Sequence, residues 1–458
     1  MIKGKIRYSL KVSFWDGFFA SCMMGFTTDY ITPYALALKA NVSQVGILNA
    51  LPNFFSSLVQ LKSADFSEKI RSKKRIVVWC VFLQALMGIP IILIPYVCKG
   101  FEIPALILFV SFFTASNGFA LPVWQSLMSE YLPSRKRGTY FGWRTKILGI
   151  VTISCMFAAG FVLQLFKNNP REVVFPVFFQ EGAHSSGIVL PVPFQEGAGV
   201  LSGFMLIFSL AFICRLVSWY FLTRMYEPPF RHERSAYFSL IDFIKIARGS
   251  NFARFVFFAA CLNFSMSLAS PFFPVYMLRD LKFGYLTYTL LIAVVTIASV
   301  ATIHRWGILS DKFGNFKLIR FNSMLIACLP FLWMMCRHPA YIFLVQGLGG
   351  LCWAGFNLCA LNFIYDAVSP AKRTRCIAYY NFFNGFALFL GPIIGGALAP
   401  NLPPLLGYRL MSLFLISGLC RVLTVCIFSG KIKEVRQVEG SRVRDIVYSI
   451  VGLKPAAE

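Results

Sequence analysis

Residues 285–304 read YLTYTLLIAVVTIASVATIH and run directly into RWGILSDKFGNFK at 305–317. The first stretch holds no Asp, Glu, Lys or Arg, and about 20 apolar residues are what a helix needs to cross the hydrocarbon core of a bilayer. The second stretch is short and basic, which is typical of loops at the cytoplasmic membrane surface. Together they predict a transmembrane helix that ends in a cytoplasmic loop.

The same alternation of apolar stretches and polar loops continues along the chain in both directions. Of the 458 residues, 57% are hydrophobic and 14% are charged, which is about half of the charged fraction of an ordinary soluble domain. We therefore predict an all-α integral membrane protein with twelve transmembrane helices. The predicted spans lie near 14–37, 42–61, 76–97, 105–127, 146–166, 201–223, 253–277, 285–304, 318–336, 341–364, 377–399 and 406–428.

The distribution of basic residues predicts the orientation. The chain has 44 Lys and Arg against 19 Asp and Glu, a net charge of +25. Segments on the side of the N-terminus hold 34 of these 44, segments on the other side hold eight, and two lie within spans. Because basic residues concentrate in cytoplasmic loops, we predict a multi-pass protein of the cell (inner, cytoplasmic) membrane with both termini in the cytoplasm. The same distribution accounts for the net charge without nucleic-acid binding.

Equivalent residues recur in the two parts of the chain. Arg137 corresponds to Arg373 at an offset of 236, and Arg215 corresponds to Arg421 at an offset of 206, a difference that a longer outer loop in the first part explains. We predict two pseudo-symmetric six-helix bundles, an arrangement known from transporters with parallel repeats. The predicted parts are an N-terminal half at 1–223 with an inserted outer loop at 167–200, a cytoplasmic linker with an amphipathic helix at 224–252, a C-terminal half at 253–430 and a basic cytoplasmic tail at 431–458.

The loop after the span at 285–304 also carries a motif. GILSDKFGNFK at 307–317 resembles the signature loop of the major facilitator superfamily, Gly-x-x-x-Asp-(Arg/Lys)-x-Gly. GPIIGG at 391–396 resembles a packing motif of that family. The helix-5 motif of the family's proton-coupled drug exporters is not matched in the sequence at 146–166, which argues against a drug antiporter.

This resemblance covers nearly the whole chain and implies a transporter that opens alternately to either side of the membrane. It also implies a cytoplasmic latch, in which acidic residues of one half hold basic residues of the other; simple loop folding is the alternative interpretation. We expect glycines to permit tight helix packing and a sharp turn there, and Asp311 to accept hydrogen bonds at a helix start. The latch residues would be Gly307, Asp311, Lys312, Gly314, Asp65, Arg137 and Arg373.

Charged residues also lie within the predicted spans. Asp29 lies about 22 Å along the first span at 1.5 Å per residue, so its carboxylate must face the bundle interior, find a partner or carry a proton. It is therefore our candidate for proton coupling or substrate contact, with a wet, paired carboxylate as the alternative. We expect Asp16 to be a solvated charge at the inner boundary, and Arg215 and Arg421 to be structural anchors that reach the inner surface.

Further candidates are neutral polar and aromatic residues on spans that line the central cavity in the resembled family. For each of them an interhelical hydrogen bond is an equally good interpretation. As a set they favour an uncharged or amphipathic solute. They are Tyr30, Tyr34, Asn53, Asn117, Trp124, Gln125, Asn263, Ser267, Trp353, Asn357 and Asn384.

We therefore predict a secondary active transporter of a small solute, with a proton or sodium ion as the coupling ion, no cofactor, no metal and a monomeric state. Two alternatives stay open: a non-transporting membrane receptor or sensor on the same fold, and a lipid or lysolipid translocator. No nucleophile paired with a base and no acidic metal cluster stands within the predicted spans, so an enzyme is the weakest interpretation.

Overall fold

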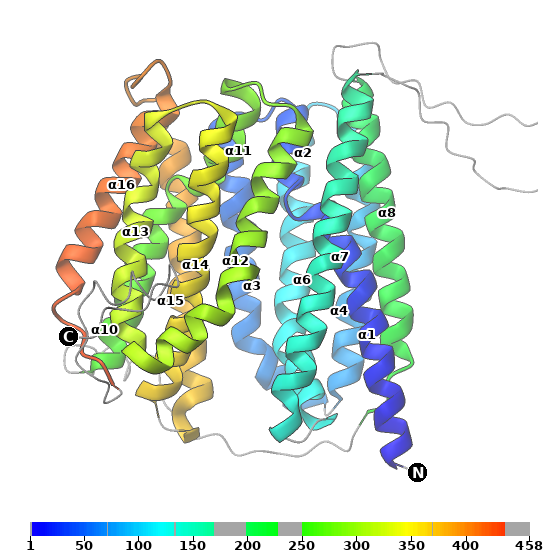
Figure 1. Ribbon diagram of the computed structural model, residues 1–458. Helices are drawn as coiled ribbons and strands as arrows, with labels where there is room; N and C mark the ends of the chain where they lie inside the picture. Colours follow the sequence, from blue (N-terminus) through cyan, green and yellow to red (C-terminus); the bar gives the residue numbers. More distant parts are fainter. Residues whose placement is uncertain are drawn as a thin grey trace, which may run out of the picture.

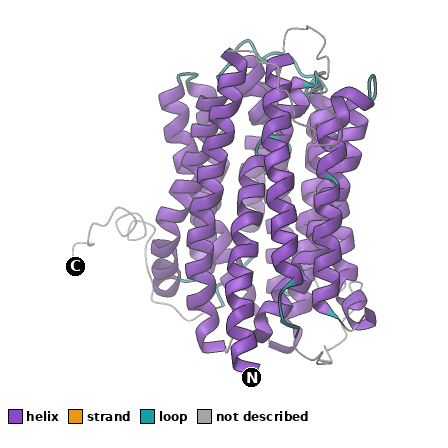
Figure 2. Ribbon diagram, turned by 90° about the vertical axis from the view of Figure 1, so that its right-hand side faces the viewer, coloured by secondary structure: helices purple, strands orange, loops and turns teal. Residues whose placement is uncertain are grey.

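The computed structural model describes residues 2–70, 72–131, 134–168, 198–227, 250–368 and 370–435. Throughout these ranges the regular structure is helical and contains no strand, so the predicted all-α class is confirmed. The long helices run side by side along one axis, and the N-terminus lies at one end of the bundle (Figures 1 and 2). We call this end the N-terminal side and the opposite end the far side. Nearly all of the predicted loop at 167–200, linker at 224–252 and tail at 431–458 lie outside the described residues.

The helices form two groups that lie next to each other in Figure 1. The first group consists of α1 (Ile2–Thr27), α2 (Ile31–Ala37), α3 (Val42–Ile70), α4 (Lys73–Leu86), α5 (Gly88–Val97), α6 (Glu102–Tyr131), α7 (Ser134–Asn168) and α8 (Ala198–Thr223). The second group consists of α10 (Asn251–Ser267), η1 (Ser270–Phe272), α11 (Phe273–Val275), η2 (Tyr276–Asp280), α12 (Tyr285–Phe313), α13 (Asn315–Met335), α14 (Pro339–Ala367), α15 (Pro370–Leu398) and α16 (Arg409–Phe428).

Ten helical stretches within the described residues are long and apolar enough to cross a membrane. The predicted spans at 14–37 and 42–61 are not among them, so the count of twelve stays a prediction. The first is interrupted by a turn at 28–30, between α1 and α2. The second lies in α3, which carries amides in its middle and charged residues near its end.

Proline explains two further interruptions of predicted spans. Helices α4 and α5 meet at Met87, three residues before Pro90, whose missing N–H leaves the carbonyl of Leu86 without its helical partner. The span that begins with α10 passes through η1, α11 and η2 around Pro271 and Pro274. The spans predicted near 76–97 and 253–277 are therefore interrupted rather than continuous α-helices.

The two groups contact each other on the far side. The Tyr30 hydroxyl, next to the turn between α1 and α2, lies 2.7 Å from the Thr289 hydroxyl of α12 and donates to the Met156 carbonyl at 2.6 Å. The Tyr288 hydroxyl donates to the Asp29 carbonyl at 2.9 Å. The Tyr30–Thr289 and Tyr288–Asp29 bonds join the beginning of α12 to the end of the first span.

Helices α3 and α15 form a second contact on this side. The Ser43 hydroxyl donates to the Gly396 carbonyl at 2.7 Å. A Cβ atom added to Gly46 would lie 2.4 Å from the Pro392 carbonyl oxygen, so the two backbones approach closely because position 46 has no side chain. The glycines of the predicted packing motif at 391–396 do lie at helix contacts.

The buried apolar side chains show the same asymmetry between the two sides. One large cluster contains side chains from both groups, and its members from the first group, such as Tyr34 and Leu163, come from the far side. A separate smaller cluster, which includes Val77 and Leu127, holds only helices of the first group together on the N-terminal side. Within the described residues, the hydrophobic core is thus shared by the groups on the far side.

Candidate functional site

A polar pocket lies within the first group, toward the N-terminal side. Side chains from α1, α4, α6, α7 and α8 line it, and its volume is about 230 Å³, which exceeds the roughly 30 Å³ that one water molecule occupies. We call it the polar pocket and define it by its lining residues, Asp16, Gly17, Ala20, Ser21, Met24, Val77, Val81, Asn117, Ala120, Leu121, Trp124, Arg144, Leu148, Arg215 and Leu222.

A buried network of hydrogen bonds crosses one wall of the polar pocket. The Arg215 guanidinium donates through Nε to Gln84 Oε1 at 2.8 Å and through Nη1 to the Ser218 hydroxyl at 3.2 Å. Ser218 in turn donates to Asp16 Oδ1 at 2.7 Å. Asp16 is 5% and Arg215 is 6% exposed, so the network links α1, α4 and α8 in the bundle interior.

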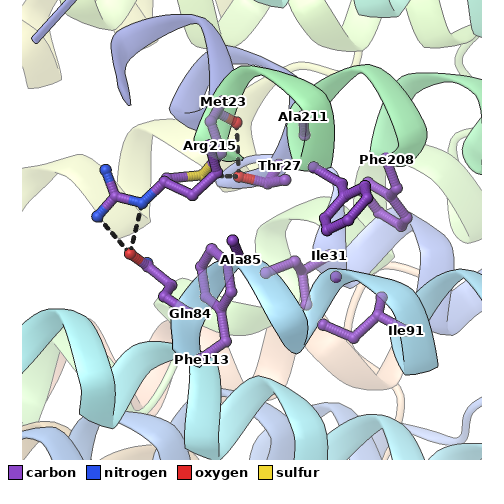
Figure 3. Close-up of a pocket in the computed structure, with 12 residues that line it drawn as sticks. Met23, Thr27, Ile31, Gln84, Ala85, Ile91, Phe113, Phe208, Ala211 and Arg215 are labelled. Carbon is purple, nitrogen blue, oxygen red and sulfur yellow. Dashed lines mark hydrogen bonds between the residues drawn. The ribbon is translucent and has the colours of Figure 1, made fainter. Parts of the chain in front are cut away.

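This network corrects our expectations for both charged residues. Asp16 is not a solvated end charge, because α8 covers it and supplies its hydrogen-bond donor. Arg215 is an anchor, but it binds Gln84 of a neighbouring helix instead of reaching the surface (Figure 3). Arg421 is likewise buried, at 3% exposed, and donates to the Ile326 carbonyl at 3.1 Å.

Arg144 of α7 lies next to α1, the helix that carries Asp16. Its guanidinium lies over the Trp124 ring at 4.8 Å and donates through Nη2 to the Ser13 carbonyl at 3.1 Å. Within the described residues, the buried Arg144 Nε and Trp124 Nε1 atoms have no hydrogen-bond partner. Two donors without acceptors therefore lie on the wall of the polar pocket.

The Arg215–Gln84 pair also borders a second, smaller cavity (Figure 3). Its volume is about 30 Å³, enough for about one water molecule. Apart from this pair and Thr27, its lining is apolar and includes Ile31 and Phe208. Thr27 donates to the Met23 carbonyl of its own helix at 2.8 Å. Arg215 thus lines both the polar pocket and this small, mostly apolar cavity.

The structure places the predicted cavity candidates in different environments. Asn117 and Trp124 line the polar pocket. Asn263 donates to Asn384 Oδ1 at 2.6 Å, which joins α10 to α15. Ser267 is buried and donates to the Ala387 carbonyl at 3.1 Å. These last three side chains satisfy one another or the backbone, in line with the alternative of interhelical hydrogen bonds.

The remaining candidates are not brought together. Tyr30 and Tyr34 are fully buried, and the Tyr34 hydroxyl donates to the Ile91 carbonyl at 3.0 Å. Asn53 is exposed and donates to the carbonyl one turn before it. Trp353 is half-buried against Phe356, Asn357 is exposed, and the side chain of Gln125 lies outside what the structure describes.

Asp29 lies in the turn between α1 and α2, on the far side. Its side chain is half-buried, close enough to Tyr30 and Tyr288 for electrostatic interaction. Residues 28–30 form a turn and do not continue α1. In this turn the Asp29 carbonyl accepts a hydrogen bond from the Tyr288 hydroxyl. Asp29 therefore stands where the two groups of helices meet.

The predicted latch loop is held by a residue that the sequence analysis did not single out. Glu434, after α16, accepts from the backbone N–H of Phe316 at 2.6 Å. Asp311 lies in the last turn of α12 and is exposed, and its expected role at the start of α13 stays a prediction. The side chains of the latch residues Asp65, Arg137 and Arg373 lie outside what the structure describes, and Lys312 is exposed.

The first group repeats this arrangement. Glu227, after α8, accepts from the backbone N–H of Lys74 at 3.0 Å and from the Ser72 hydroxyl at 2.9 Å. In both groups a carboxylate that follows the last helix thus binds the N-terminus of the group's third span, where the helix dipole favours negative charge. We call these two contacts the Glu227 clasp and the Glu434 clasp.

The two latch glycines are expected to respond differently to substitution by alanine. Gly314 has φ of 89°, and a Cβ atom there would lie 2.6 Å from the Glu434 carboxylate, so Gly314→Ala should destabilise the protein by about 1 kcal/mol or more. A Cβ at position 307 would meet nothing closer than Leu358 at 3.9 Å, so Gly307→Ala should be neutral or stabilising. The expected tight packing at Gly307 is therefore wrong. Thermal unfolding of the two purified variants measures the difference, and equal midpoints would contradict it.

The fold and the polar pocket together define a polytopic membrane protein with an internal polar site. The sequence profile of the Major Facilitator Superfamily matches residues 14–345 and 255–445. The chain therefore belongs to the Major Facilitator Superfamily, and the family and the structural comparisons point to a membrane transporter. Among curated proteins, none matches the sequence.

Solved structures of transporters share the fold. The nucleoside transporter NupG is 14% identical with a TM-score of 0.67, covering 93% of this chain and 100% of that one. A bacterial homologue of the iron transporter ferroportin, in an inward-facing state, is 12% identical with a TM-score of 0.64, covering 94% and 99% of the two chains. A bacterial homologue of the human lysosomal transporter Spinster, inward-facing and unoccupied, is 14% identical with a TM-score of 0.61, covering 93% and 95%.

Proposed function

We propose that this protein is a secondary active transporter that moves a small, uncharged or amphipathic solute across the cell membrane by alternating access. The observation that carries the proposal is the asymmetry of the contacts between the two groups of helices. Their bonds and their shared core lie on the far side, while the polar pocket lies toward the N-terminal side. With the N-terminal side in the cytoplasm, as predicted, this arrangement suits a state open to the cytoplasm.

Spin labels test the alternation directly, without knowledge of the solute. One pair of labels would replace Asn41 and Asn401, both exposed on the far side in different groups. The other pair would replace Lys62 of α3 and Leu361 of α14, both exposed toward the N-terminal side. We expect two populations in lipid nanodiscs. In one, the far-side pair is close and the N-terminal-side pair is far apart; in the other, the far-side pair is far apart and the N-terminal-side pair is close. A single population in both pairs under all gradients and pH values would contradict the proposal.

Asp29 is the proposed coupling residue. It lies where the groups meet, and in the proposed cycle its protonation would favour one arrangement of the groups over the other. We expect Asp29→Asn to abolish solute movement driven by a proton gradient while counterflow exchange continues, because exchange needs no net proton transfer. Both rates would be measured in proteoliposomes. Asp280→Asn is the control, since this carboxylate is half-buried like that of Asp29 and is paired with Arg279 at 2.9 Å on the same side. Equal loss of both rates, or of neither, would count against coupling through Asp29.

A further inference from the structure

The polar pocket has an excess of hydrogen-bond donors. Arg144 Nε and Trp124 Nε1 are buried without partners among the described residues, and both can only donate. A buried donor without an acceptor costs about 1–3 kcal/mol. Asp16 accepts from Ser218 through Oδ1 and Gln84 accepts from Arg215, while neither Arg144 Nε nor Trp124 Nε1 donates to any oxygen of the described residues. The two free donors therefore call for an acceptor supplied by a ligand.

The charges that line the polar pocket do not balance. At full ionisation Arg144 and Arg215 contribute two positive charges and Asp16 contributes one negative charge, and no other Asp, Glu, Lys or Arg is among the lining residues. An uncompensated charge inside a membrane protein is unfavourable. One monoanion would bring the total to zero, whereas a neutral ligand would leave one positive charge and a dianion would leave one negative charge.

Apart from Ser21, Asn117 and Trp124, the rest of the lining is apolar. Met24, Val77, Leu121 and Leu148 face the same space as the charged groups. A ligand that fits both parts has one charged end and an apolar body, within the roughly 230 Å³ of the pocket. A carboxylate also offers two oxygens to an arginine in the geometry that a guanidinium prefers.

We propose that the polar pocket binds the singly charged carboxylate of a small amphipathic solute, with Arg144 and Trp124 as donors to its oxygens. This inference rests on the proposed transport function and specifies its solute class. It narrows the predicted uncharged or amphipathic solute to an amphipathic one with a single negative charge. Asp16 keeps the site at a single positive charge and thereby selects a monoanion over a dianion.

Binding can be tested with benzoate as the probe, benzamide as its neutral isostere and benzylamine as a cation. The purified full-length protein would be heated in a neutral detergent with each compound. We expect benzoate alone to raise the unfolding midpoint, by about 2 °C or more when it saturates the site. A rise of equal size with benzamide, or no rise with benzoate, would overturn the proposal. Phosphatidylglycerol is a further arm, since its headgroup is also a monoanion: stabilisation by this lipid and not by benzoate would overturn a solute site.

Substitutions test whether benzoate raises the unfolding midpoint by binding in the polar pocket. Arg144→Gln should lose the benzoate response, and Arg144→Lys, which keeps the charge but not the planar pair of donors, should retain a weaker one. Arg224→Gln is the matched control, because this arginine also lies over an aromatic ring, Tyr220 at 5.0 Å, but is exposed and outside the pocket. A benzoate response that survives in Arg144→Gln would overturn the proposal.

A second readout separates this inference from the proposed function. Benzoate should quench tryptophan fluorescence in the wild type, and the change should shrink in Trp124→Phe. If benzoate fails to bind while the spin-label distances still show two populations, the carboxylate site is wrong and the transport proposal stands. If benzoate binds and the distances show a single population, the transport proposal falls and the carboxylate site stands.

Discussion

Replacement of Gly46 by leucine is expected to abolish transport while the helices still fold. A Cβ atom at this position would lie 2.4 Å from the Pro392 carbonyl oxygen and 3.2 Å from Gly396 Cα. Real Cβ atoms do not approach backbone that closely, and neither backbone can yield without moving its helix. Because the contact joins α3 of one group to α15 of the other, the clash acts on the far-side closure and not on the packing inside either group.

The spin-label pair at Asn41 and Asn401 measures this effect. In Gly46→Leu we expect the population with the long far-side distance to grow and the population with the short distance to shrink. Proteoliposomes with this variant should show neither net flux nor exchange of solute. Gly149→Leu is the control, since Gly149 of α7 has no atom within 4 Å of an added Cβ. An unchanged distance distribution in Gly46→Leu would show that this glycine does not support the closure.

Asp16→Ala is expected to cause the largest loss of stability. The substitution leaves Arg215 buried without the carboxylate that Ser218 connects to it, and it leaves Arg144 without its nearest negative charge. Removal of one partner from a direct buried ion pair costs about 3–5 kcal/mol, because the remaining charge stays out of water; since Ser218 lies between Asp16 and Arg215, we expect a loss of about 3 kcal/mol or less. The midpoint of thermal unfolding of the purified protein would measure the loss.

A double variant tests whether the charge itself is the cause. Asp16→Asn combined with Arg215→Gln removes both charges and keeps polar groups of similar size, so it should be more stable than Asp16→Ala. The pair Arg279–Asp280 provides the comparison, because its arginine side chain is 49% exposed and an ion pair open to water contributes about 0–1 kcal/mol. Equal losses from Asp16→Ala and Asp280→Ala would contradict a buried network.

The helical class was predictable from the sequence because hydropathy depends only on local composition. The breaks were harder to predict. The turn at 28–30 begins at the second of two threonines and ends at Tyr30, and no proline marks it; the contacts of Tyr30 and Asp29 with α12, more than 250 residues later, stabilise it. Contacts between residues so far apart in the sequence cannot be detected in a hydropathy window of about 20 residues.

The candidate site was likewise only partly predictable from local sequence. Asn117 and Trp124 were predictable from their place on the span at 105–127, but Arg144 was counted among loop charges that set the orientation. Position along a span gives depth, whereas Asp16 and Arg144 owe their roles to neighbours on other helices. Charge counting cannot separate a solvated arginine from one that lies over an indole ring.

The Glu227 and Glu434 clasps have a consequence for how the molecule could move. Each clasp ties the last helix of a group to the third span of the same group, so a shift of one group against the other would leave both intact. Such a shift would break the Tyr30–Thr289, Tyr288–Asp29 and Ser43–Gly396 bonds. A chain shortened to end before residue 434 would lose one clasp and with it the stiffness of the second group, so that the group would deform instead of pivoting.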